Sequence, residues 1–90
     1  MSRKIYYDGE KILKGASNHR RLEILSLLHK TPGLSTDEIV QSLKLNYQTG
    51  AVHIQKLVRA GLVIGYRQGL SVGHKISPLG LSIIRLCIKQ

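Results

Sequence analysis

Two adjoining stretches decide the fold: Leu34-Ser-Thr-Asp-Glu-Ile-Val-Gln-Ser-Leu43 and, after one lysine, Leu45-Asn-Tyr-Gln-Thr-Gly-Ala-Val-His-Ile-Gln-Lys-Leu-Val-Arg-Ala-Gly-Leu-Val63. In the first stretch, Ser35 and Glu38 have the spacing of a capping box, in which each side chain satisfies a backbone N–H at a helix start. In the second stretch, Asn46 is a favoured N-cap residue. The two stretches therefore predict two short helices joined by a tight turn.

The preceding segment predicts the central core helix. Leu22, Leu25 and Leu28 recur at helical spacing, and neighbouring Ile24 and Leu27 widen the apolar face beyond that of a surface helix. Asn18 is the expected N-cap, and Thr31-Pro32-Gly33 is the expected end. Further upstream, we expect a short helix capped by Asp8, preceded by a loosely held arm over residues 1–7.

A hairpin and a last helix follow the helix pair. Leu62-Val63-Ile64 and the set Val72, His74 and Ile76 predict two strands of a wing over residues 62–77, with turn chemistry from Gln68-Gly69 and Gly73. Ser77 and Pro78 predict the start of a helix over 78–89. The expected fold is mainly α with a small β-hairpin. This is a winged helix-turn-helix, with residues 35–60 as the helix-turn-helix of a single domain over 1–90.

Charge indicates the partner class. Fourteen Lys and Arg against five Asp and Glu give a net charge of +9, which a polyanion such as double-stranded DNA would balance. A membrane surface is less suited, because the cations are spread along the chain and no apolar run is long enough to span a bilayer. The single cysteine, Cys87, precludes an intrachain disulfide, and the N-terminus lacks a signal-peptide core; we therefore expect a cytoplasmic protein.

Neither catalysis nor metal binding is indicated. The five carboxylates are scattered, and no nucleophile has an identifiable base, so we expect no enzyme. His19 and His29 do not share a helix face and are expected at the surface. For His53, a hydrogen bond within the fold is at least as favoured as a phosphate contact. We expect no cofactor and no metal, and no effector is indicated.

The second helix of the pair, over 47–60, is the expected recognition helix in the DNA major groove. Its buried stripe is expected to contain Gly50, Ile54, Leu57 and Val58, which leaves the opposite face for bases and phosphates. Expected phosphate contacts also come from the first helix of the pair and from the wing. The candidate DNA-binding residues are Ser35, Thr36, Lys44, Asn46, Tyr47, Gln48, Thr49, Ala51, Val52, Gln55, Arg59, Arg67, His74 and Lys75.

The chain resembles ArsR-type winged-helix repressors across about residues 12–81. The resemblance rests on the opening helices from Ile12 to Leu25, on the two stretches quoted first, and on Arg67-Gln-Gly-Leu-Ser-Val-Gly-His-Lys-Ile-Ser77 as the wing. The ending Ile76-Ser-Pro-Leu-Gly80 is also similar to MarR-like and archaeal winged-helix regulators. The resemblance implies DNA binding. The family's metal-sensing residues are missing, because the third helix has no cysteine and the last helix has neither histidine nor carboxylate.

The last helix is apolar on more than one face, which predicts a homodimer. Its expected interface residues are Leu79, Ile83, Ile84, Leu86 and Cys87. A two-fold dimer would present its recognition helices to successive major grooves of a palindromic site, as a repressor does when it occludes a promoter. Two other functions remain open: a winged helix used for protein–protein contact, and non-specific nucleic-acid binding.

Overall fold

The computed structural model describes residues 19–87, with side chains to residue 86. The elements are α2 (His19–Lys30), α3 (Thr36–Leu43), α4 (Tyr47–Arg59), β1 (Val63–Gln68), β2 (Ser71–Ile76) and α5 (Pro78–Cys87). This order confirms the expected helices and hairpin of a winged helix-turn-helix. The expected arm, the helix capped by Asp8 and the Asn18 cap lie outside the described residues.

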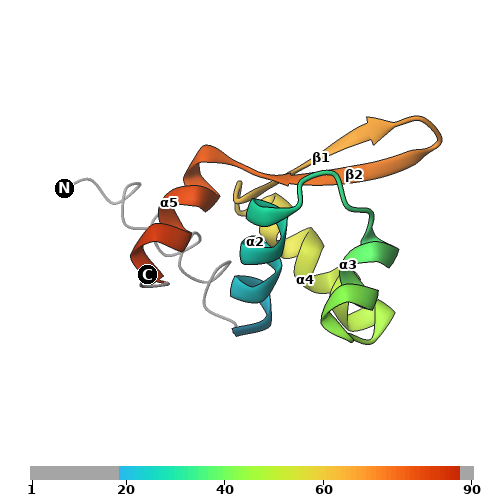
Figure 1. The fold of residues 1–90 in the computed structure, drawn as a ribbon, viewed down its shortest axis with the longest axis horizontal. Helices are drawn as coiled ribbons and strands as arrows, with labels where there is room; N and C mark the ends of the chain where they lie inside the picture. The colour runs from blue at the N-terminus through green and yellow to red at the C-terminus, as the bar shows by residue number, and fades with distance from the viewer. Residues whose placement is uncertain (1–18, 88–90) are drawn as a thin grey trace.

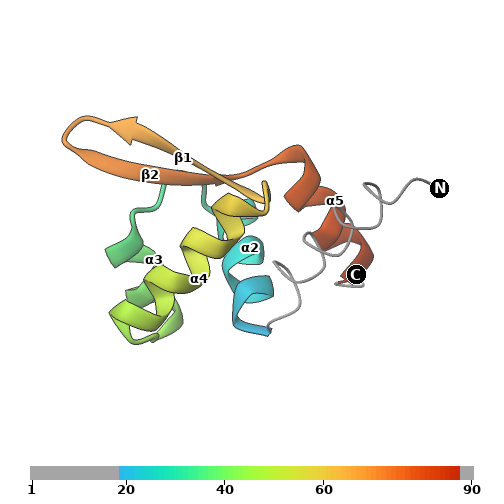
Figure 2. The ribbon, with the colours of Figure 1, turned by 180° about the vertical axis from the view of Figure 1, so that it is seen from behind.

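The core surrounds α2. Ile24, Leu25 and Leu28 are completely buried, as the width of the apolar pattern predicted. In Figures 1 and 2, α2 lies between α5 and the α3–α4 pair, and the hairpin runs along one edge of this bundle and extends beyond it. From α5, Ile83 and Ile84 complete the same cluster, so two of the residues expected at a dimer interface belong to the chain's own core.

Local caps fix the ends of the helix pair. Glu38 donates its backbone N–H to Ser35 Oγ at 3.2 Å, and Ser35 donates its own to Glu38 Oε1 at 2.9 Å, which confirms the capping box. Lys44 adopts a left-handed conformation at φ 56° and ends α3. Asn46 then caps α4 by accepting the Thr49 N–H at 3.2 Å. The turn between the two helices is therefore short and defined at both ends.

The hairpin is antiparallel, with six residue pairs from Val63–Ile76 to Gln68–Ser71. Gly69 has φ 65° and supplies the turn, as expected. Gly73 does not lie in the turn. It is buried within β2, where a Cβ would lie 3.1 Å from the Gly33 carbonyl oxygen and 3.2 Å from Tyr66 Cζ. Its role is close packing of the hairpin against the loop that follows α2.

Ser77 joins the end of α4 to the start of α5. It accepts the Gly80 N–H at 2.9 Å, which confirms the predicted cap, and its hydroxyl donates to the Gly61 carbonyl oxygen at 2.6 Å. Because Ser77 is 6% exposed, these bonds lie inside the protein. None of the helices between residues 19 and 87 is long and apolar enough to cross a membrane.

Candidate nucleic-acid interface

A close contact between α3 and α4 sets the position of α4. A Cβ at Gly50 would collide with the Val40 side chain, so glycine lets the two helices approach. On the same inner face, Ile54 is 3% exposed and Leu57 is completely buried. Val58 was expected in this stripe but is 41% exposed. It follows the buried Leu57, so its side chain points to the next side of the helix, toward the groove beside the hairpin.

The outer face of α4 is a stripe of four exposed side chains on successive turns: Gln48, Val52, Gln55 and Arg59. No acidic residue lies in the first turn of α4, whereas the first turn of α3 contains Asp37 and Glu38. The positive end of the α4 dipole therefore meets solvent without a neutralising carboxylate, which favours a phosphate there rather than at α3.

A groove of about 520 Å³ runs between α4 and the hairpin. The partly exposed Val58 and Val72 give it apolar walls from both sides. Its polar groups come from α3, α4 and β2. The lining residues are Thr36, Tyr47, Ala51, Ile54, Gln55, Val58, Arg59, Gly65, Val72 and His74. Four predicted contact residues of α4 (Tyr47, Ala51, Gln55 and Arg59) therefore meet the wing across one groove.

The two faces of the hairpin separate Arg67 from Lys75. Side chains alternate along a strand, so Arg67 shares its face with Gly65 and with its cross-strand partner Val72, both of the groove. Lys75 pairs with Ile64 on the other face, where its Nζ lies 5.5 Å from the centre of the Tyr66 ring. The sequence predicted both cations as wing contacts without separating the two faces of the hairpin; the structure places Arg67 on the α4 side and Lys75 on the other face.

His74 is not a surface residue of the wing. It is 6% exposed, and its backbone pairs with Leu34, which adds an isolated bridge beside β2. Its Nδ1 lies 2.9 Å from the Leu34 carbonyl oxygen, so Nδ1 must donate the hydrogen there. The ring therefore lies in the lining of the groove with little of its surface exposed, and its contact with DNA stays a prediction.

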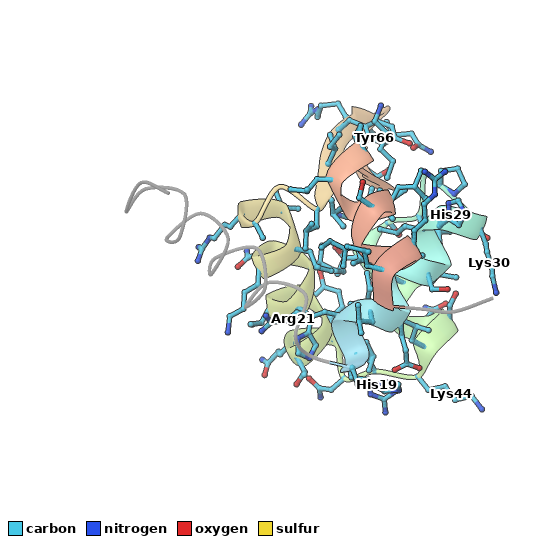
Figure 3. The ribbon with its side chains drawn as sticks, turned by 90° about the vertical axis from the view of Figure 1, so that its left-hand side faces the viewer. His19, Arg21, His29, Lys30, Lys44 and Tyr66 are labelled. Atoms are coloured by element: carbon cyan, nitrogen blue, oxygen red, sulfur yellow. The ribbon has the colours of Figure 1, made fainter. Side chains whose placement is uncertain are left out.

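The remaining candidates lie at the ends of α3 and the start of α4. Ser35 Oγ already caps α3, whereas Thr36 lines the groove. Lys44 is exposed, and Figure 3 shows its side chain extending from the turn into solvent. Asn46 and Thr49 are exposed beside the first turn of α4. Thr36 is therefore the α3 residue best placed beside the α4 face.

The side of α4 that lies away from the hairpin carries basic residues that the sequence did not predict as a group, Arg21 and Lys56 beside His53. We call these residues the basic flank of α4. Arg21 Nε donates to His53 Nδ1 at 3.2 Å and so connects α2 to α4 (Figure 3 labels Arg21). Burial, together with the positive charges of Arg21, Lys56 and Arg20, lowers the pKa of His53. Lys56, three residues after His53, was the available sequence signal, but the contribution of α2 required the tertiary structure. His53 therefore has the internal hydrogen bond that was one of its two expected roles.

Potential metal ligands are dispersed. His19 and His29 are exposed near opposite ends of α2 (Figure 3). Within residues 19–87, no three histidine, cysteine, aspartate or glutamate side chains gather where they could hold a metal ion.

Comparison with known proteins identifies the family. The family model for winged helix-turn-helix DNA-binding proteins matches residues 17–64, more than half of the chain. The chain therefore belongs to the winged helix-turn-helix DNA-binding family. Its fold and family are those of transcriptional regulators rather than enzymes. No curated protein sequence matches it.

Solved structures agree over nearly the whole chain. The transcriptional repressor PagR of Bacillus anthracis is 31% identical, with a TM-score of 0.82 over 94% of this chain and 98% of that one. HlyU from Vibrio cholerae is 30% identical, with a TM-score of 0.78 over 92% and 87%. The homodimeric winged helix-turn-helix domain of Mb0332 from Mycobacterium bovis, a possible ArsR-family regulator, is 26% identical, with a TM-score of 0.80 over 93% and 79%. The likeness to Mb0332, a possible ArsR-family regulator, agrees with the ArsR-like resemblance of the sequence.

Proposed function

We propose that the protein is a sequence-specific, homodimeric repressor that binds double-stranded DNA with α4 in the major groove. The observation that carries the proposal is the stripe Gln48, Val52, Gln55 and Arg59, which is exposed along α4 beside a groove shared with the hairpin. Glutamine amides pair with adenine edges, and a valine packs on a thymine methyl. The stripe thus has the chemistry for reading bases, and Arg59 and Arg67 have the charge for holding phosphates.

The two sides of α4 suit the two DNA sugar-phosphate backbones that border a major groove. On the hairpin side, the groove has apolar walls for sugar, and Arg59 in its lining and Arg67 on the same face of the hairpin offer charge for phosphate. On the other side, Lys56 and Arg21 lie close to His53. Phosphate contacts of this kind fix the register of the protein without specifying sequence, so specificity falls to the stripe between them.

The proposed dimer uses the outer face of α5. Leu79 is 39% exposed and Leu86 is 77% exposed, and their spacing of two turns places them on one face. Ile83 and Ile84 instead pack inward, and Cys87 ends α5 with its side chain outside the described residues. Homodimeric Mb0332 and the repressor PagR support the oligomeric state and the regulatory direction. We place this function in the cytoplasm.

The variant Gln48→Ala/Gln55→Ala tests the base-reading role. Both side chains are exposed, so the fold should persist, while discrimination between a selected site and its scrambled sequence should fall by about 1–3 kcal/mol for each base pair no longer read. Gln41→Ala, at an exposed glutamine of α3 outside the groove, is the matched control. Unchanged discrimination in the double variant would contradict the proposal.

Light scattering on Leu86→Glu tests the dimer. A buried carboxylate at the interface should convert the dimer to a monomer. Leu70→Glu places the same charge at another exposed leucine and should leave the mass unchanged. A Leu86→Glu protein that remains dimeric would exclude this face as the interface.

A further inference from the structure

The tip of the hairpin presents an apolar side chain that the fold does not use. Leu70 has a relative exposure of 102%, the largest among the exposed large hydrophobic residues that the structure describes. We propose that Leu70 is a wedge that enters the minor groove next to the major groove occupied by α4. This assignment rests on the proposed DNA binding.

Neither the core nor the turn requires leucine at this position. Gly69 has φ 65°, whereas Leu70 is not among the residues with positive φ, the pattern of a turn whose first central residue must be glycine. The second central position tolerates most residues, and turns usually place polar ones there. Leu70 is fully exposed among residues 19–87, so its apolar surface is available to a partner there.

The tip is held in a defined shape. Gln68 and Ser71 form the last residue pair of the hairpin, and Ser71 Oγ donates to the Gln68 carbonyl oxygen at 3.1 Å. Only two residues connect the strands, so little conformational freedom remains to be lost on binding. Leu70 is therefore presented by a preorganised support rather than by a long loop.

The reach and charge of the hairpin fit a neighbouring minor groove. Six residue pairs span about 20 Å, comparable with half a turn of duplex DNA, roughly 17 Å. Figure 1 shows this end of the hairpin extending past the helices. On the α4-facing side, Arg67 and the 45% exposed Val72 lie next to the tip. A cation beside apolar side chains is the combination with which minor-groove proteins read width and unstack a base step.

A lipid surface is the other partner that an apolar tip could meet. The neighbouring exposed stripe of α4 contains three polar side chains, Gln48, Gln55 and Arg59, and one apolar side chain, the 48% exposed Val52. Base edges and phosphates match those groups, so the surroundings of Leu70 favour DNA. Insertion should be easiest at pyrimidine–purine steps, which unstack most readily.

The test combines selection and fluorescence with the full chain. Duplexes recovered from a randomised pool by the unaltered protein are remade with 2-aminopurine at the flanking steps, and binding should raise its fluorescence. Leu70→Ser should abolish the rise and weaken binding roughly tenfold, in proportion to the apolar surface no longer buried. Ile64→Thr, a similar change on the opposite face of the hairpin, is the control and should leave both unchanged.

The outcomes separate this assignment from the function on which it rests. Normal DNA binding by Leu70→Ser, with the fluorescence rise retained, would overturn the wedge and leave the proposed function intact. Binding to anionic vesicles is measured in parallel. If Leu70→Ser lost binding to the vesicles and kept its binding to DNA, the wedge would be overturned in favour of a lipid partner. Absence of DNA binding by the unaltered protein would overturn both.

Discussion

Arg67 and Lys75 provide a matched pair of cations on one hairpin. Replacing either by alanine lowers the net charge from +9 to +8, so any general electrostatic effect on DNA binding is the same in the two variants. Their positions differ: Arg67 shares its face with the groove beside α4, whereas Lys75 lies over Tyr66 on the opposite face. Only Arg67→Ala should remove a phosphate contact.

The expected magnitude follows from counterion release. Removing one phosphate contact makes the slope of log K against log [salt] shallower by about 0.9. The ratio of the DNA affinity of the unaltered protein to that of Arg67→Ala should then shrink by a factor of about 3.5 between 50 and 200 mM salt. At the lower salt, loss of one charge-assisted hydrogen bond corresponds to roughly tenfold weaker binding. Lys75→Ala should match the unaltered protein in slope.

Fluorescence anisotropy with one selected duplex, repeated at four salt concentrations, measures both quantities. Thermal unfolding checks that each variant is folded, since Lys75→Ala also removes a contact with Tyr66 worth about 0.5–1 kcal/mol. A slope that changes for Lys75→Ala and stays constant for Arg67→Ala would refute the assignment of the hairpin faces.

The close approach of α3 to α4 and the basic flank of α4 give two further predictions. Gly50→Ala should destabilise the protein by about 1–3 kcal/mol from overpacking against Val40, less the helix-propensity gain. In the double variant with Val40→Ala, denaturant melts should show a smaller destabilisation than the sum of the two single variants; strict additivity would exclude the collision. Because the pKa of His53 is lowered in the folded protein, the unfolded chain binds a proton at His53 at a higher pH than the folded protein does. The free energy of unfolding should therefore decline as the pH falls below about 6.5. Urea unfolding between pH 7 and 5 should show a shallower decline for His53→Gln, and an equal decline would contradict the assigned environment.

Features with local causes could be predicted from the sequence. The caps at Ser35, Asn46 and Ser77 each involve residues three apart, so their side-chain chemistry suffices. The exposed stripe of α4 follows from helical periodicity alone. These signals account for the helix order and for most of the base-reading candidates.

Features that depend on distant residues could not be predicted. His74 is buried because the chain at Leu34 pairs with β2, forty residues away. Arg21 and His53 meet across thirty-two residues. Val58, on the side of α4 next to Leu57, stays exposed because the hairpin leaves a groove beside it. In each case, the environment of the side chain is set by packing between elements that no local pattern specifies.

The central claim is sequence-specific DNA binding by a dimer, and selection from a randomised duplex pool at several salt concentrations tests it most directly. We expect recovery of a palindromic motif whose half-sites lie about one helical turn apart, with an advantage over random DNA that persists at moderate salt. Uniform recovery with a steep salt dependence would contradict specificity, and absence of any bound DNA would contradict DNA binding altogether.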